Sequence, residues 1–154
     1  MQVRSLFLIG LVCCGWLLPG HAGTAKAQSL PGPLNAELLR VIDGDSLAVR
    51  VTIWLDQTLE VVVRLRGIDA PERRGRCADE RRRALEARDA LARLVAGRRL
   101  ALSNIEDGKF AGRVIADVTA GEVSLSDALL AGGFARPYAG GTRRGWCGGQ
   151  SNIR

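Results

Sequence analysis

The sequence predicts a mainly β domain, a five-stranded Greek-key barrel with one long and one short helix. Two observations lead to this fold class. Five segments have the composition or the alternation of β-strands, and one long amphipathic segment falls between the third and the fourth of them. One long helix inserted after the third of five strands is the order expected of a barrel of the OB type.

The strand predictions depend on β-rich runs bounded by turn residues. Alternation is clearest in residues 46–55, where every second residue from Leu47 to Ile53 is apolar. A tight turn at residues 43–45 precedes this segment, and residues 56–58 are the expected hairpin connection after it. The five predicted strands are residues 36–42, 46–55, 59–65, 99–103 and 113–118, with a polar loop at 104–112.

Two segments have helical periodicity. Residues 78–96 carry a stripe of Ala, Leu and Val at helical spacing, and Arg, Glu and Asp fill the rest of the surface. Gly97 stands where a glycine commonly ends a helix. A short second helix is predicted over residues 124–130, with Ser124 as its N-cap and Gly132 after its end.

The first 27 residues differ from the rest of the chain. They combine a basic start, an apolar run over residues 6–18 and a short small-residue end at Ala27, which together predict a secretory signal peptide. The run is shorter than the roughly 20 residues of a transmembrane helix. We therefore expect cleavage after Ala27, a secreted or periplasmic protein and no membrane anchor. The expected organisation is a leader at 1–27, a flexible lead-in at 28–35, a domain at 36–147 and a flexible tail at 148–154.

Cleavage would restrict the available chemistry. It removes His21, the chain's one histidine, and two of the four cysteines, which excludes a histidine general base, a histidine zinc site and a metal site built from four cysteines. It also removes two of the 22 Lys and Arg residues and none of the 16 acids, leaving a net charge of 20 − 16 = +4. Nearly all remaining bases are arginines, which suit phosphate. The excess of arginine alone is weak evidence for this, because it can also reflect the base composition of the genome.

Three short polar segments stand between the apolar strands. They are the Asp-Gly-Asp turn at 43–45, the run at 63–72 that ends in Asp69-Ala70-Pro71-Glu72, and the basic segment at 109–113. Each has a simple structural interpretation, respectively turn chemistry, a solvated edge with its own ion pairs, and a basic loop. Arg64 and Arg66 lie two apart, so in a regular strand they would share one face.

Taken together and in this order, the three segments are a much more specific signal than any one of them alone. The order Val41-Ile42-Asp43-Gly44-Asp45-Ser46, Val63-Arg64-Leu65, Gly67-Ile68-Asp69-Ala70-Pro71-Glu72 and Gly112-Arg113-Val114 resembles the staphylococcal nuclease (thermonuclease) family. The resemblance covers residues 38–138. From the short stretch that follows, we expect the third helix of the longer family members to be absent.

The resemblance implies a role for each matching residue. A Ca2+ ion would be bound by the carboxylates of Asp45 and Asp69 and by the backbone carbonyl of Ala70. Asp43 would lie next to these ligands without binding the ion itself. The catalytic residues would be Glu72, as the base or water-orienting carboxylate, and the phosphate-gripping Arg64 and Arg113. Lys109 and Tyr138 are further substrate-binding candidates, although Tyr138 at the edge of the core is an equal alternative.

The chemistry of these residue types agrees with phosphodiester hydrolysis. That reaction needs positive charge near the phosphate oxygens and an aligned water. Arginine forks and a hard cation supply the charge, and without histidine a carboxylate is left as proton acceptor. We therefore expect a monomeric Ca2+-dependent nuclease that cuts DNA and, as a second substrate, RNA. The alternative from another class is a non-catalytic OB-fold nucleic-acid-binding module.

The two remaining cysteines, Cys77 and Cys147, are predicted to form a disulfide. The leader would direct the chain to an oxidising compartment, and the two thiols have no metal partner set. Such a bond would tether the glycine-rich C-terminal segment beside the predicted catalytic loop. Two unpaired buried thiols are the alternative.

Overall fold

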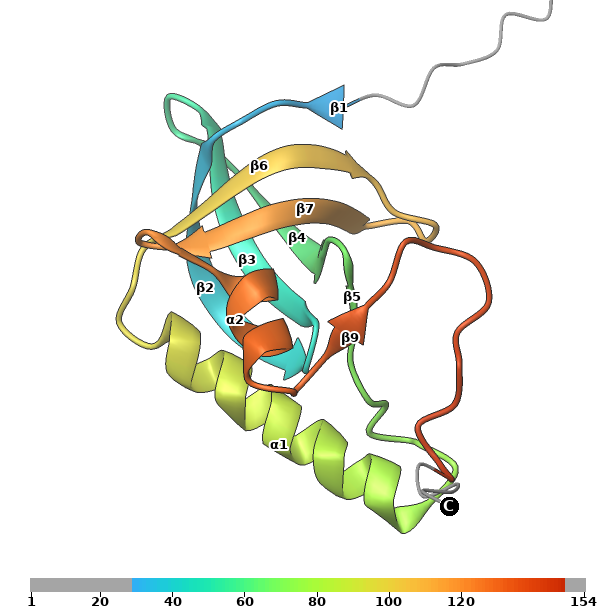
Figure 1. The fold of residues 1–154 in the computed structure, drawn as a ribbon. Coiled ribbons are helices and arrows are strands. Elements are labelled where there is room, and N and C mark those ends of the chain that lie inside the picture. Colours follow the sequence, from blue (N-terminus) through green and yellow to red (C-terminus); the bar gives the residue numbers. More distant parts are fainter. Residues whose placement is uncertain (1–28, 149–154) are drawn as a thin grey trace, which may run out of the picture.

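Hydrogen bonds close five long strands into a barrel in the computed structural model, which describes residues 29–148 (Figure 1). The barrel strands are β2 (Leu34–Asp43), β3 (Ser46–Trp54), β4 (Gln57–Leu65), β6 (Leu100–Asp107) and β7 (Arg113–Ala120). The helices are α1 (Ala78–Val95) and α2 (Leu125–Ala131), and the short strands are β1 (Ser29–Leu30), β5 (Ile68–Asp69), β8 (Val123–Ser124) and β9 (Arg136–Pro137). The predicted mainly β barrel with one long and one short helix is confirmed.

The barrel closes through one parallel strand pair. Around it, β2 pairs with β3, β3 with β4, β2 with β6, and β6 with β7, all antiparallel. The remaining pair, β4 and β7, is parallel, and it places Val62 opposite Arg113 and Arg64 opposite Ile115. The start of β7 therefore lies beside the end of β4, although α1 and β6 separate these two strands in the sequence.

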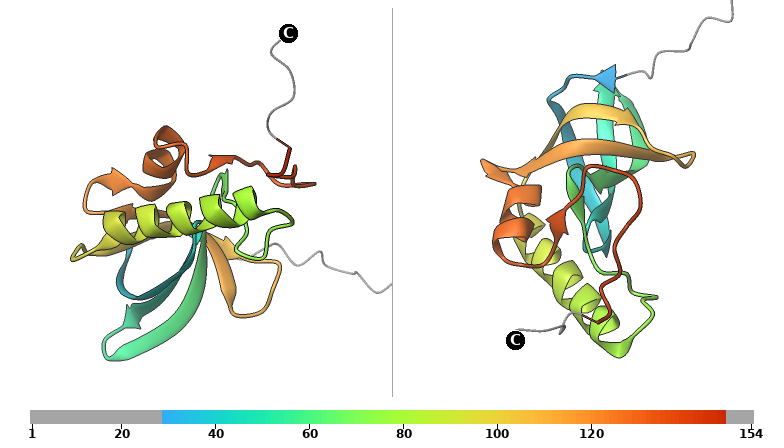
Figure 2. Two further views of the ribbon diagram at one scale, coloured as in Figure 1. Left: turned by 90° about the horizontal axis from the view of Figure 1, so that it is seen from below. Right: turned by 45° about the vertical axis from the view of Figure 1, so that its right-hand side comes forward.

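The core follows the alternation of the strands. Leu47, Val49 and Val51 of β3 are at most 3% exposed, as the predicted alternation required, whereas Ile53 at the end of the same alternation is 52% exposed. Helix α1 lies across one end of the barrel, with α2 beside it (Figures 1 and 2). The buried stripe of α1 includes Ala84, Ala87 and Leu91, whereas Leu85, an apolar residue of the same helix, is 54% exposed because it lies off this face.

Both helix ends identified from the sequence are present. Ser124 is the N-cap of α2, where its Oγ accepts a hydrogen bond from the backbone N–H of Asp127. Gly97 follows the end of α1 with φ +66°, a left-handed conformation that glycine adopts without steric cost. Cys77 is the N-cap of α1, and its Sγ accepts from the Glu80 N–H.

The N-terminal part of the domain differs from the prediction of a flexible lead-in at 28–35. Ser29 and Leu30 pair with β6, and β2 begins at Leu34, so backbone hydrogen bonds order this segment. The predicted leader and, except for Gly148, the predicted tail lie outside the described residues. Between residues 29 and 148, no helix is long and apolar enough to cross a membrane.

Arg64 and Arg66, two residues apart in the sequence, form ion pairs with different carboxylates. Strand β4 ends at Leu65, as predicted, and the chain turns at Gly67 with φ +79°. The Arg66 N–H still donates to the Ala116 carbonyl of β7 at 2.9 Å, and both arginines line a pocket beside Gly67. Arg66 pairs with Glu106 at 3.1 Å. Strand β6 reaches Glu106 because it runs past the predicted end at residue 103, with a register shift between Ser103 and Glu106.

Gly44, in the turn between β2 and β3, packs directly against α1. A Cβ there would lie 2.7 Å from the Cβ of Ala87 and 2.9 Å from that of Ala70. Gly44→Ala should therefore lower the free energy of unfolding by about 1–3 kcal/mol, as overpacking does, in a urea titration. Gly145→Ala is the control, because its Cβ would meet nothing closer than 4.0 Å. Equal stability of the two variants would contradict this packing.

Candidate active site

A polar pocket of about 500 Å3 opens beside the end of the barrel, and it gathers residues from four segments of the chain. Most of its lining comes from the predicted site residues. The lining consists of Asp43, Ser46, Arg64, Glu72, Lys109, Phe110, Arg113, Tyr138, Gly141 and Arg143. Asp45, Asp69 and Ala70 are almost completely buried. Asp69 and Ala70 line a neighbouring pocket of about 360 Å3, which shares Glu72 and Arg143 with the first.

Asp45 is held by the Asp-Gly-Asp turn. Its backbone N–H donates to Asp43 Oδ1 at 3.2 Å, an arrangement that turn aspartates commonly form. The Asp45 carboxylate accepts hydrogen bonds from Ser46 Oγ at 2.9 Å and from the Ala70 backbone N–H at 3.1 Å. The first two polar segments of the sequence are therefore joined through this one side chain.

Burial raises the pKa of Asp45 to about 6 from its ordinary 3.8. Removal of the carboxylate from water is the largest cause, and Arg64 acts in the opposite direction by stabilising the charged form. The charge of Asp43 adds to the rise. In this environment, any additional positive charge beside Asp45 would stabilise the charged form of its carboxylate.

Arg64 connects the two buried carboxylates. Its Nη2 lies 2.8 Å from Asp45 Oδ2 and 3.7 Å from Asp69 Oδ1. Both carboxylates therefore flank the same guanidinium group, at the end of β4. Arg64 has 11% of its side chain exposed, and that part faces the pocket.

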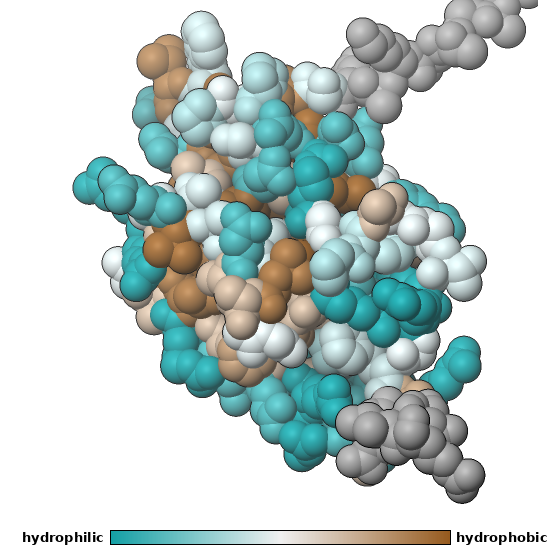
Figure 3. Space-filling view, in the orientation of Figure 1, coloured by the Kyte–Doolittle hydropathy of each residue, from teal (hydrophilic) through white to brown (hydrophobic). Residues whose placement is uncertain are grey.

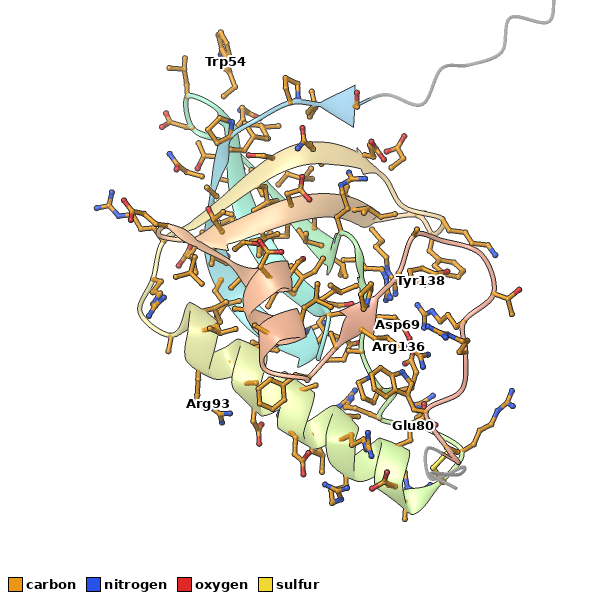
Figure 4. The ribbon with its side chains drawn as sticks, in the orientation of Figure 1. Trp54, Asp69, Glu80, Arg93, Arg136 and Tyr138 are labelled. Atoms are coloured by element: carbon orange, nitrogen blue, oxygen red, sulfur yellow. A yellow bond between two sulfur atoms is a disulfide. The ribbon has the colours of Figure 1, made fainter. Side chains whose placement is uncertain are left out.

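Asp69 is fixed in orientation by donors to one of its two oxygens. Strand β5 pairs with β9, which sets Asp69 opposite Arg136 (Figure 4). Oδ2 accepts from Arg136 Nε at 3.2 Å, from Arg136 Nη2 at 2.9 Å and from Trp146 Nε1 at 3.2 Å. Oδ1 is buried and accepts no hydrogen bond from the described residues.

The more exposed side of the pocket carries Glu72 and the basic residues. Glu72 is 53% exposed and forms an ion pair with Arg143. Arg113 begins β7, and its guanidinium carbon lies 5.3 Å from the centre of the Phe110 ring. Lys109 lines the same pocket from the loop before β7.

Tyr138 also lines the pocket, but its polar groups have partners within the protein. Its hydroxyl donates to the Gly141 carbonyl at 2.7 Å, and its backbone N–H donates to the Gly67 carbonyl at 2.9 Å. These contacts fix the chain as it leaves β9. A role for Tyr138 in substrate binding stays a prediction.

Sequence reasoning did not identify Arg136, Arg143 and Trp146, which all contact Asp69. Their backbone follows the core pattern only weakly, so periodicity gave no signal. One available signal was the predicted disulfide, which already placed this segment beside the catalytic loop. The structure contains that bond between Cys77 and Cys147, with Cα atoms 6.0 Å apart.

The residues around the two carboxylates fit a hard divalent cation. They offer oxygen atoms, which Ca2+ prefers. The buried Asp69 Oδ1 accepts no hydrogen bond in the described part of the chain, and its partners there are the ion pairs with Arg64 Nη2 at 3.7 Å and Arg143 Nε at 3.3 Å. A second group of metal-ligand residue types, Cys77, Glu80 and Cys147, does not fit a metal while the disulfide is formed. Its two sulfur atoms are bonded to each other, so neither is a thiolate ligand.

Comparison with known families agrees with this arrangement. A family model described as staphylococcal nuclease homologue matches residues 62–145, more than half of the chain. The matched region contains Arg64, Asp69, Glu72 and Arg113, whereas the Asp-Gly-Asp turn lies before it. No curated protein matches the chain in a sequence search.

Proposed function

Since the chain belongs to the staphylococcal nuclease family, we propose that it is a Ca2+-dependent nuclease that hydrolyses phosphodiester bonds in DNA and RNA with little sequence preference. The family match supports a nuclease-like or nucleic-acid-binding module, and the family is typically metal-dependent. The observation that carries the catalytic proposal is the pair of buried carboxylates flanking Arg64, at a pocket also lined by Arg113.

Each pocket residue has a chemical task in this proposal. Arg64 and Arg113 would hold the oxygens of the scissile phosphate through charge-assisted hydrogen bonds, which strengthen as charge develops on those oxygens. Glu72, exposed at the pocket, would orient the attacking water and accept its proton. Asp45, Asp69 and the Ala70 carbonyl would hold Ca2+, which when bound supplies further positive charge to the phosphate.

The internal contacts of the site support these roles. Asp45 and Arg64 pre-orient each other through two contacts, so little reorganisation of either side chain is needed when substrate arrives. Arg136 and Trp146 do the same for Asp69 by fixing Oδ2. Fixed groups of this kind are the main source of electrostatic catalysis.

A non-catalytic nucleic-acid-binding module explains the pocket less well. Binding alone would use the basic residues, including Lys109 and Arg113, because backbone phosphates dominate the affinity for nucleic acids. It would give no task to two buried carboxylates, which reduce attraction for a polyanion. We further propose that the protein acts outside the cytoplasm, on the basis of the leader-like residues 1–27 and the disulfide. We also propose that it is a monomer.

The proposal predicts dependence on a metal ion. Protein purified from an oxidising compartment should cleave single-stranded DNA, double-stranded DNA and RNA with Ca2+, and cleavage should stop in excess chelator because an oxygen-only site favours hard cations. Gel electrophoresis of the products measures this, and re-addition of Ca2+ is the control for irreversible loss.

Two results would count against the proposal in different ways. Undiminished cleavage in chelator would contradict the role of the metal. Tight binding of the same substrates without cleavage under every metal condition would favour the binding module.

A further inference from the structure

Residues 138–147, which we call the strap, connect the barrel to the start of α1. At one end the strap follows the β5–β9 pairing and the hydrogen bond from Tyr138 to Gly67. At the other end the disulfide fixes Cys147 to Cys77, the N-cap residue of α1. In Figures 1 and 2 this segment runs outside the barrel between those two anchors, beside the chain that follows β5.

The strap carries Arg143 to the centre of the candidate site. Arg143 Nε lies 3.3 Å from Asp69 Oδ1, and Nη1 pairs with Glu72. Its guanidinium carbon also lies 5.9 Å from the centre of the Tyr138 ring. Arg143 thus touches one predicted metal ligand, the predicted catalytic carboxylate and one predicted substrate-binding residue.

Arg143 still has capacity for another acceptor. A guanidinium carries five N–H donors, and within residues 29–148 its ion pairs use Nε and Nη1, so the Nη2 donors remain. The side chain is 38% exposed and lines the same pocket as Arg64, Lys109 and Arg113. Figure 3 shows hydrophilic side chains gathered on this side of the molecule.

We propose that Arg143 is a substrate-binding residue that contacts a backbone phosphate of the nucleic acid, and that the Cys77–Cys147 bond positions it for this contact. The inference rests on the proposed function insofar as nucleic acid must enter this pocket. Arg64 and Arg113 are placed by barrel strands, but Arg143 lies on a segment without regular structure of its own. Its two anchors therefore determine how much of the time it points into the pocket.

The direct test measures binding without cleavage. The dissociation constant of a fluorescein-labelled single-stranded oligodeoxynucleotide is measured in excess EDTA at several KCl concentrations. Arg143→Ala should raise the dissociation constant by about 5–10-fold at low salt, and it should reduce the slope of log affinity against log salt by about 0.7, the loss of one phosphate contact to a single strand.

Arg144→Ala is the matched control. It removes the same charge from the adjacent position of the strap, but Arg144 does not line the pocket that holds Arg64 and Arg113. Its dissociation constant should stay within about twofold of the wild-type value. Arg143→Lys should restore part of the affinity lost in Arg143→Ala, because the charge returns without the guanidinium fork.

The role of the disulfide is tested with a double-mutant cycle. Arg143→Ala is measured in the wild type and in the variant Cys77→Ser/Cys147→Ser, at a temperature where circular dichroism shows both to be folded. If the bond positions Arg143, its replacement should change binding less than about twofold once the bond is absent. A merely stabilising disulfide would leave the full 5–10-fold effect in place, and that result would overturn the positioning role.

The remaining outcomes separate this inference from the proposed function. Unchanged affinity and unchanged salt slope in Arg143→Ala would overturn the inference, even if the wild type is an active nuclease. Unchanged affinity for the oligonucleotide with tighter Ca2+ binding would also overturn it, since Arg143 would then serve only as a counter-ion of Asp69 and Glu72. A wild type that never cleaves but binds through Arg143 would contradict the nuclease and support the inference.

Discussion

Arg113→Ala, Glu72→Ala and Arg64→Ala should each lower the rate of phosphodiester cleavage by at least about 100-fold, the usual effect of removing one preorganised electrostatic group. All three side chains line one pocket, and two of them bring positive charge to the site where the phosphate would sit. The rate is measured at saturating substrate, so that weaker binding does not account for the loss.

Arg66→Ala is the control for this series. Arg66 lies two residues from Arg64 but pairs with Glu106 and Asp117, away from the pocket. Its replacement should change the rate less than about tenfold. An essential Arg66 beside a dispensable Arg64 would show that the catalytic register is wrong.

Arg64→Ala carries an additional cost to stability. It leaves the buried Asp45 without its ion-pair partner, and an unpaired buried charge is strongly destabilising. Its thermal unfolding must therefore be measured alongside its activity. Glu72 is 53% exposed, so Glu72→Ala tests the catalytic proposal even if Arg64→Ala unfolds.

Removal of the disulfide should produce the largest loss of stability. The bond joins residues 70 apart in sequence, and in the chain-entropy model a closed loop of this length is worth roughly 4 kcal/mol. Cys77→Ser/Cys147→Ser should lose up to about this amount in urea unfolding. Serine is a favourable N-cap residue, so the start of α1 keeps its cap in this variant.

Reductant provides the matching experiment on the wild type. Intact mass after alkylation, with and without prior reduction, establishes whether the two thiols are joined in the purified protein. Reduced wild type and the double serine variant should then unfold at similar urea concentrations. Two freely alkylated cysteines in protein from an oxidising compartment would contradict the bond.

Sequence patterns predicted most of the barrel because each strand faces both core and solvent. The alternation of β3 and the helical stripe of α1 appear directly in burial, and the caps at Gly97 and Ser124 are local features. The N-terminal strand β1 was not predictable in this way. It is only two residues long, both exposed, and it exists because β6 offers backbone partners to it.

The candidate site shows the same difference between residues in local patterns and residues with distant partners. Asp45, Arg64 and Asp69 were identified because they stand in short motifs, and the structure brings their carboxylates and guanidinium together. Arg136 and Arg143 were missed because their partners are about 70 residues away, so no local pattern marks them.

The parallel pairing of β4 with β7 has a consequence for how the protein folds. Val62 finds Arg113 only after a long intervening loop, which includes α1, has been closed. Domains dominated by such non-local pairings generally fold in milliseconds to seconds, rather than in the microseconds of helical bundles. The pocket takes Arg64 from β4 and Arg113 from β7. It therefore cannot exist in a partly folded form in which these two strands are not yet paired. Nucleic-acid binding at the pocket would accordingly appear in refolding experiments together with barrel closure and not before it.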